Sequence, residues 1–517
     1  MIKKITIFLI LLQMVFIINA QNNEFNIAVS SLDLTLNPFY TYTANEAQFL
    51  SGIYEGLVSY NPQDLTPEPA LAESWRVSED KKKYFFKIRK DLKFSNGESI
   101  TSETFRDSFL KAINPDTQAE FASLLDIIKN AKDYRTGKNR DVESVGISTD
   151  GEDTLIFTLE KRAPYFTKIL CHHTFTPIPT SLLNQKVWSI DQVVSSGPYL
   201  IKKNESQITL LKNPKYWDKE NVYFDKINIK SYTSSTDATA DYNRGDIDWL
   251  TDNAIDLNSV SDLETLKVNP LFATTFYYFN SSYKEYKSAK IRKAISLLIP
   301  WNKIREKQYI PANSLIPSLS NFPKNIINSE QNIEEALKIL ADEGYKNGKG
   351  LSDIILSIPK NTYSDSYISS VIKENIEKYS SIKVIIKETS YPDFFTINRS
   401  EEFTISTLSW IGDFADPLTF LEMWTSNSNL NDSNFRSIEF DELIENSSNL
   451  TQDERYEQLS QGEKLLLENS IVLPINHSPG INVIDTRYIN GWYTNTLDIH
   501  PFKYLRVVDK HIIYGLI

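Results

Sequence analysis

Short runs in which every second residue is apolar recur along the chain. Phe86 and Ile88 are one such pair, and Leu155, Phe157 and Leu159 form another. This spacing places apolar side chains on one face of a strand. The pattern predicts strands at residues 25–29, 155–159, 275–280, 351–358, 383–387, 403–408 and 471–475.

Other segments have the spacing of a helix. Ile291, Ala294, Ile295 and Leu298 fall on one helical face, and Pro300 ends the run. Further helices are predicted at residues 101–112 behind a Thr cap, 332–343 and 451–468 behind capping boxes, 367–379 and 440–446. Because helices and strands alternate between residues 351 and 408, the fold class is α/β.

The length of 517 residues is enough for roughly three domain-sized units. The formal net charge of −12 argues against nucleic acid as a partner, since phosphate backbones require basic surfaces. Aromatic residues make up 12% of the chain, so we expect some of them to line a cleft as well as the core.

Residues 1–20 have the pattern of a secretory signal. Lys3 and Lys4 precede an apolar run at residues 5–18, and we expect cleavage after Ala20. No cysteine follows the signal, so a lipid anchor is not expected there. The single cysteine, Cys171, cannot form an intramolecular disulfide, and secretion without disulfides favours a bacterial periplasm.

The tripeptide Cys171-His172-His173 is a candidate for metal binding. Adjacent histidines on a strand point to opposite faces, and the chain has five histidines in all without a spaced ligand set. We therefore interpret the tripeptide as structural and expect no metal and no cofactor.

Residues 409–424 place Trp410 beside two carboxylates, Asp413 and Asp416, before Pro417 turns the chain. A carboxylate among large aromatic side chains is costly to desolvate unless a cation meets it. That cation could belong to a ligand. The alternative is that Asp413 only caps the turn before Pro417.

This stretch resembles a signature of the family 5 extracytoplasmic solute-binding proteins, which serve ABC importers of oligopeptides, dipeptides and nickel. Further motifs of that family are matched along the chain. They are residues 53–58 (IYEGLV), 196–200 (SGPYL), 213–218 (NPKYWD), 240–248 (ADYNRGDID), 291–299 (IRKAISLLI) and 471–475 (IVLPI). The motifs at residues 196–218 read as a hairpin whose Asn-Pro turn buries Tyr216 and Trp217.

The resemblance implies a type II periplasmic-binding-protein-like fold, with two hinged lobes and an additional inserted domain. The expected divisions are signal peptide 1–20, lobe I 21–60, inserted domain II 61–180, lobe I 181–275, lobe III 276–488 and lobe I 489–517.

In peptide-binding members of the family, the aspartate at the position of Asp413 pairs with the α-ammonium group of the ligand. The resemblance implies ligand contacts for its neighbours Trp410, Ile411 and Gly412. It also implies main-chain contacts from a second segment, Ala44, Asn45 and Glu46, whose alternative role is a plain helix N-terminus. Arg399 is the candidate for the ligand carboxylate.

The implied function is capture of short peptides by a monomeric periplasmic protein, followed by delivery to ABC permease subunits in the inner membrane. One alternative is a nickel chelate or another small solute on the same scaffold, and another is a receptor without import. A secreted glycoside hydrolase using Asp413 and Asp416 is the enzyme alternative. No nucleophile elbow, zinc-protease motif or P-loop is present in the sequence, so we expect no enzyme.

Overall fold

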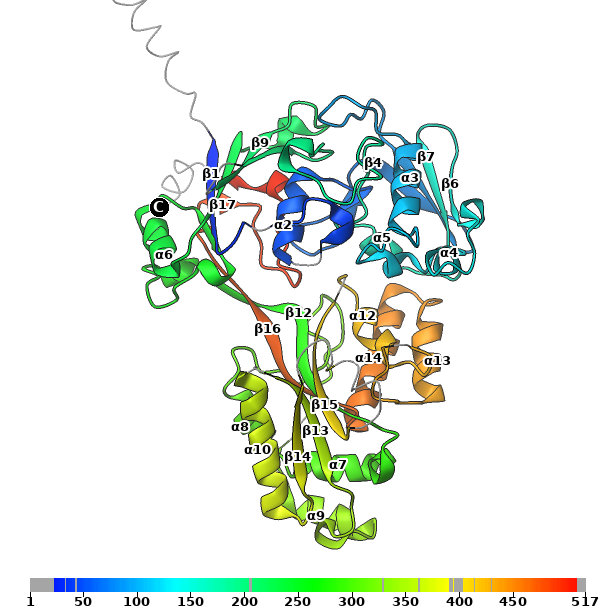
Figure 1. Ribbon diagram of the computed structural model, residues 1–517, viewed down its shortest axis with the longest axis vertical. Coiled ribbons are helices and arrows are strands. Elements are labelled where there is room, and N and C mark those ends of the chain that lie inside the picture. The colour runs from blue at the N-terminus through cyan, green and yellow to red at the C-terminus, as the bar shows by residue number, and fades with distance from the viewer. Residues whose placement is uncertain are drawn as a thin grey trace, which may run out of the picture.

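The computed structural model in Figure 1 describes residues 23–32, 34–41, 44–203, 207–327, 330–360, 363–389, 394, 403–412, 414–428 and 430–508. The chain forms an upper body and a lower body, and two long strands pass between them. We refer to the lower body as lobe III. The predicted signal peptide lies outside the described residues. Within these ranges, none of the helices has the length and apolar character needed to span a bilayer.

One ten-stranded sheet extends through both bodies. Its order is β14 (Val384–Thr389), β13 (Ile354–Pro359), β15 (Ile405–Ile411), β12 (Leu266–Phe279), β16 (Val472–Ile484), β11 (Trp249–Thr251), β1 (Glu24–Val29), β10 (Lys226–Ser231), β9 (Gln207–Lys212) and β8 (Tyr199–Lys203). The strands that connect the bodies are β12 and β16. They pair antiparallel, with a break in register between Pro270 and Thr274.

The upper body is built around β1, which pairs in parallel with β10 and β11. The predicted hairpin is confirmed, since β8 and β9 pair antiparallel, and Tyr216 is buried as predicted, whereas Trp217 is only half-buried. Tyr216 and Trp217 donate hydrogen bonds to the buried carboxylate of Glu55, at 2.7 and 2.6 Å. Lys503 Nζ donates to the same carboxylate at 2.7 Å. The C-terminal part of the chain therefore returns to the upper body and closes it over this carboxylate. The upper body also contains two helices, α2 (Ala44–Ile53) and α6 (Ser235–Arg244). Two short strand pairs complete it: β2 (Val58–Tyr60) with β3 (Pro67–Pro69), and β17 (Ile489–Asn490) with β18 (Arg506–Val507).

A separate four-stranded antiparallel sheet lies beside the upper body. Its order is β4 (Ala72–Val77), β5 (Lys83–Ile88), β7 (Thr154–Thr158) and β6 (Ile147–Thr149). Helix α3 (Ser102–Ala112) begins at the predicted cap Thr101 and lies against β6 and β7, and the shorter α4 (Ala131–Arg135) and α5 (Phe166–Ile169) follow. We call this unit the inserted domain, because it interrupts the chain of the upper body. The domain divisions given above remain a prediction.

Lobe III combines parallel and antiparallel pairing. The parallel strands β13 and β14 are joined by α10 (Tyr363–Tyr379), which packs on both. A core of apolar side chains from β13, β14, α7 (Ala289–Leu297), α9 (Ile333–Asp342) and α10 fills this side. Trp301, at the start of α8 (Trp301–Arg305), is buried in the same core. On the other side lie α12 (Leu418–Leu421), α13 (Ile438–Ser447) and α14 (Gln452–Glu468), below the inserted domain.

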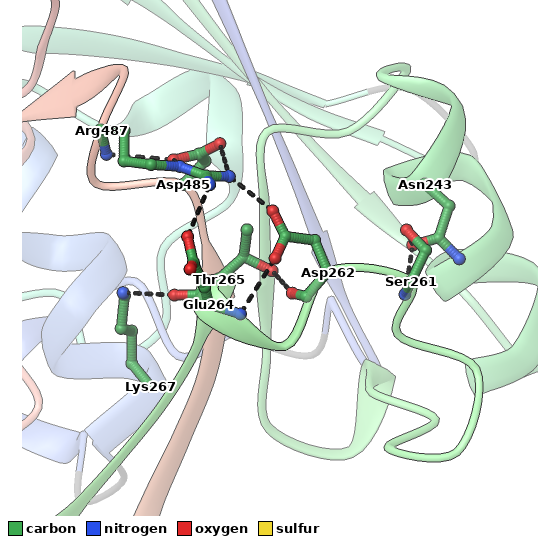
Figure 2. Close-up of polar contacts among 8 residues, drawn as sticks. All are labelled: Asn243, Ser261, Asp262, Glu264, Thr265, Lys267, Asp485 and Arg487. Atoms are coloured by element: carbon green, nitrogen blue, oxygen red, sulfur yellow. Dashed lines mark hydrogen bonds and ion pairs between the residues drawn. The ribbon is translucent and has the colours of Figure 1, made fainter.

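The upper ends of the two connecting strands are held by one arginine (Figure 2). Arg487, three residues after β16, donates to Asp485 at 2.8 Å, to Asp262 at 2.5 Å and to Glu264 at 2.8 Å. Glu264 belongs to a short 3₁₀ helix that leads directly into β12. One guanidinium therefore bridges the start of β12 and the end of β16.

Candidate functional site

The motif residues Trp410 and Ile411 end β15, and Gly412 follows it. The strand thus extends three residues beyond its predicted end at residue 408. Trp410 is half-buried, and its indole N–H donates to the carbonyl of Thr419 at 2.8 Å. Ile411 is 70% exposed. The Gly412 N–H donates to the carbonyl of Phe272 at 2.7 Å, and a Cβ on Gly412 would come within 2.3 Å of the Phe272 ring. Gly412 thus lets the chain pass close to β12.

Among the described residues, no strand pairs with one edge of β15 next to these residues. Pairing with β13 covers only Ile405 opposite Leu356 and Ser406 opposite Ser357. Within the described ranges, residues 408–411 therefore have a ladder partner only in β12. Exposed main-chain groups on such an edge can accept an additional extended strand.

Asp413, the expected ammonium partner, lies outside the described residues, and so does Arg399. The second carboxylate of the motif, Asp416, is 1% exposed and forms a two-pronged pair with Arg455, at 2.6 and 2.8 Å. Burial would raise the pKa of Asp416, but the charge of Arg455 holds it below its usual value. Its Oδ1 also accepts from the N–H of Leu418 at 3.1 Å, which secures the start of α12.

A lysine from the inserted domain reaches this pair. Lys168, on α5, donates to the carbonyl of Ala415 at 2.8 Å and contacts the Tyr456 hydroxyl at 3.2 Å. Its Nζ lies 3.6 Å from Asp416. The inserted domain and lobe III are therefore joined directly beside the segment that carries Asp413.

An aromatic contact reinforces the same junction. The ring of Tyr165, one residue before α5, stacks on Phe414 with centroids 5.6 Å apart and 12° between the planes. The guanidinium carbon of Arg455 lies 5.3 Å from the centre of the Tyr165 ring. Stacking and cation–π contacts of this kind fix the relative orientation of the two elements.

Two overlapping cavities of about 530 and 520 Å³ lie between the inserted domain and lobe III. We refer to them together as the interlobe cavity. Both are lined by Ser123, Asp126, Lys132, Lys161 and Tyr165 on one side and by Glu422 and Leu430 on the other. Trp410 and Phe414 line the second cavity. Their volume and aromatic walls are typical of small-ligand sites.

The second predicted segment begins α2 in the upper body. The backbone of Ala44 and Asn45 starts this helix, and their side chains lie outside the described part of the chain. Glu46 is buried, and its carboxylate accepts from the Thr35 N–H at 3.0 Å. The side chain of Glu46 therefore has a structural contact that the sequence did not indicate.

Cys171, His172 and His173 lie in a turn after α5, so the assumption that they occupy a strand was wrong. The two imidazole rings do not point apart. Their centroids are 4.3 Å apart, and His173 Nε2 is 2.6 Å from the Thr41 hydroxyl. Burial lowers the pKa of His173 to about 4, so the ring is neutral at pH 7. Among the described residues, no group of three or more His, Cys, Asp or Glu side chains is arranged to hold a metal ion.

The junction formed by Lys168, Asp416 and Arg455 could not be predicted from the sequence. Lys168 and Ala415 are 247 positions apart, and no local motif links them. The glycoside hydrolase alternative requires Asp413 and Asp416 to act as an acid–base pair. Asp416 is buried and paired with Arg455, so its carboxylate cannot reach a substrate and cannot act together with Asp413.

Comparison with known proteins identifies the group to which this architecture belongs. The family model described as bacterial extracellular solute-binding proteins, family 5 Middle, matches residues 66–432. The chain belongs to this family. Its members are extracytoplasmic or periplasmic, and those that this chain resembles are solute-binding proteins of ABC transporters rather than enzymes.

Individual family members match over most of their length. The chain is 27% identical over 478 residues to the oligopeptide-binding protein OppA of Bacillus subtilis (strain 168), covering 87% of this chain and 86% of that protein. A crystal structure of the oligopeptide-binding protein OppAIV from Borrelia burgdorferi is 26% identical, with a TM-score of 0.72, and covers 94% of this chain and 100% of that one.

The unliganded, open form of the murein tripeptide-binding protein MppA has a TM-score of 0.78 at 22% identity and covers 95% of this chain and 99% of that one. The family and the type II fold predicted from the sequence are thus confirmed.

Proposed function

We propose that this protein captures short peptides outside the cytoplasm and delivers them to the permease of an ABC importer. The observation that carries the proposal is the open edge of β15, which borders an aromatic cavity at the junction of two domains. An extended peptide can pair its main chain with that edge regardless of its side chains. The relatives named for oligopeptides support the choice of ligand.

In this proposal, Asp413 binds the peptide's ammonium group, and Trp410 and Ile411 flank it. Asp416 does not compete for the ammonium group, because Arg455 already satisfies it. The start of α2, at Ala44 and Asn45, offers main-chain groups from the upper body. Closure of the lobes about β12 and β16 then encloses the ligand and presents a closed form to the permease.

The mature protein begins after Ala20 in this account and acts as a periplasmic monomer without a cofactor.

Calorimetric titration with one peptide in two forms tests the ammonium contact. Asp413→Asn should weaken binding of the peptide with a free amino end by about 1.5–3 kcal/mol, or about 10- to 150-fold. The N-acetylated peptide should bind the parent protein weakly and should not be affected by the substitution. Equal affinity of Asp413→Asn and the parent protein for the free peptide would remove Asp413 from this role.

A further inference from the structure

The two strands that connect the bodies share a weak point. Pro270 of β12 lies opposite Pro479 of β16, and the ladder between the strands is interrupted from Pro270 to Thr274. Neither proline has an N–H to donate to the ladder, and an irregularity of this kind lets a strand bend. The two strands can therefore bend here, and we call residues 270–274 and 477–479 the hinge break.

A segment near the C-terminus contacts both strands beside the hinge break. Asn269 Nδ2 of β12 donates to the carbonyl of Asn495 at 2.9 Å, and Asn482 Nδ2 of β16 donates to the Asp498 carboxylate at 3.0 Å. Both asparagines lie on the upper-body side of the break, because β12 leaves the upper body and β16 enters it there. We call residues 495–500 the strap, because they tie the two strands together at this point.

The strap is anchored in the upper body. The side chain of Gln48, on α2, accepts from the His500 N–H at 2.6 Å and donates to the His500 carbonyl at 2.9 Å. The His500 ring stacks on Trp492, with centroids 4.1 Å apart and 16° between the planes. The Asn495 side chain donates to the carbonyl of Ile499 at 2.9 Å and closes the strap into a loop. The strap is thus fixed to the helix whose first residues form the second predicted ligand segment.

Inside the hinge break, Phe272 connects the strap to the end of β15. Its N–H donates to the carbonyl of Thr496 at 2.6 Å, and its carbonyl accepts from the N–H of Gly412 at 2.7 Å. The ladder between β12 and β16 skips Phe272, so these two bonds take the place of ladder bonds. A series of hydrogen bonds therefore runs from the strap through Phe272 to residues 410–412, which we call the ligand motif.

Apolar side chains of the strap reach the same region. Leu497 and Ile499 pack against a small buried cluster formed by Tyr60, Leu65 and Ala415. Tyr60 and Leu65 precede the inserted domain in the chain, whereas Ala415 lies in lobe III, three residues beyond the ligand motif. The strap therefore contacts the polypeptide on both sides of the ligand motif, through Phe272 and through Ala415.

We propose that the strap positions the ligand motif by holding Phe272 at the pivot of the hinge. Lobe III turns about the hinge break, while Phe272 and the Gly412 bonded to it stay with the strap. The end of β15 then keeps its place relative to α2 in both the open and the closed form. This inference rests on the proposed function, since it takes the ligand motif and the start of α2 to be the two ligand-binding segments. A ligand can contact both segments before the lobes close, because closure leaves the distance between them unchanged.

Hydrogen exchange of the full mature chain, measured without ligand and resolved to single residues by mass spectrometry, tests this role. Asn269→Ala/Asp498→Gly removes the side-chain contacts of the strap with both strands, and glycine suits position 498 because φ there is +53°. The amides of Phe272 and Gly412 should both exchange about tenfold faster, as expected for the loss of two hydrogen bonds. The amides of β13 should exchange at the parent rate.

Asp498→Asn is the matched control. Its amide oxygen can still accept from Asn482, and asparagine tolerates a positive φ. This variant should therefore exchange like the parent at Phe272 and Gly412.

Three results would overturn the proposal. If Phe272 alone exchanges faster in the double variant, the strap holds β12 but does not position Gly412. If neither amide changes, the strap does not hold the hinge strand. If the amides of β13 accelerate as much as those of Phe272 and Gly412, both in the double variant and in Asn269→Ala alone, the contacts only stabilise the fold. Because no ligand is present, these results do not depend on peptide binding, which the calorimetric titration of the parent protein decides separately.

Discussion

Replacing Asp416 with asparagine should destabilise the protein strongly, although Asp416 is the motif carboxylate to which we assign no ligand. In the parent, Asp416 and Arg455 are 1% and 0% exposed and share two hydrogen bonds. Asp416→Asn removes the negative charge and leaves the guanidinium buried without a counterion. Breaking one side of such a pair costs about 3–5 kcal/mol.

The size of the thermal effect follows from the chain length. The entropy of unfolding near 60 °C is about 2 cal/mol/K per residue, or about 1 kcal/mol/K for a chain of this length. The melting temperature should therefore fall by about 3–5 °C at pH 7, as measured by differential scanning calorimetry. Asp116→Asn, at an aspartate whose side chain is 79% exposed, is the control and should melt like the parent.

The pH dependence has a definite sign. Because the folded-state pKa of Asp416 is lowered, its contribution to stability is present above the unfolded pKa and is lost as the pH falls through the folded pKa. The difference between parent and variant should shrink in acid. Replacing Arg455 with methionine in the Asp416→Asn background should restore part of the loss. If Asp416→Asn alone melts within 1 °C of the parent, Asp416 does not neutralise Arg455 in the folded protein.

Two further predictions concern other buried or bridging groups. Lys168→Met should loosen the contact between the inserted domain and lobe III by about 1 kcal/mol, because it removes the donor to Ala415 and Tyr456. Spin labels placed on the two domains should then report longer distances in the unliganded variant, and unchanged distances would contradict the junction. Burial raises the pKa of Glu463 to about 7, so folding takes up a proton and the stability from this group is lost as the pH rises from about 4.5 through 7. Glu463→Gln should therefore reduce the dependence of the unfolding free energy on pH in this range, and it should be more stable than the parent at pH 8 by up to about 3 kcal/mol. Urea unfolding at several pH values measures this. If the parent and the variant give parallel curves of unfolding free energy against pH, the Glu463 carboxyl is not protonated.

Much of the local structure could be predicted because its causes lie within a few residues. The cap of α3 at Thr101 and the capping box of Thr451 and Glu454 at α14 are confirmed. The caps were predictable because the side chain and the N–H that it satisfies are three residues apart. The apolar alternation at Phe86 and Ile88 likewise identified β5, whose buried face these residues share.

Features that depend on distant partners could not be predicted. The strand at residues 403–408 was expected to end before Trp410, yet β15 continues to Ile411 because β12 supplies partners as far as Ala273. The histidine pair lies in a turn because α5 ends at Ile169, three residues before His172, and the tripeptide itself does not show where that helix ends.

In the candidate site, too, the residues of a local motif could be predicted and those that depend on distant partners could not. Trp410 and its neighbours were predicted from a short motif, and the structure places Trp410 on a cavity wall. Lys132, Lys161 and Lys168 come from the inserted domain, and their approach to lobe III depends on how the two domains pack. A lysine in a sequence has no feature that separates a cavity wall from an ordinary solvated surface.

If the cavity beside β15 holds peptides, the protein should carry them when it is isolated from the cell. The mature protein should be purified without denaturant and extracted with acid, and the released compounds should be identified by mass spectrometry. We expect a mixed ladder of short peptides whose lengths report the extent of the cleft. Recovery of a single metal complex or a sugar, with no peptide, would show that the cavity does not hold peptides and would remove Asp413 from its role at the ammonium group.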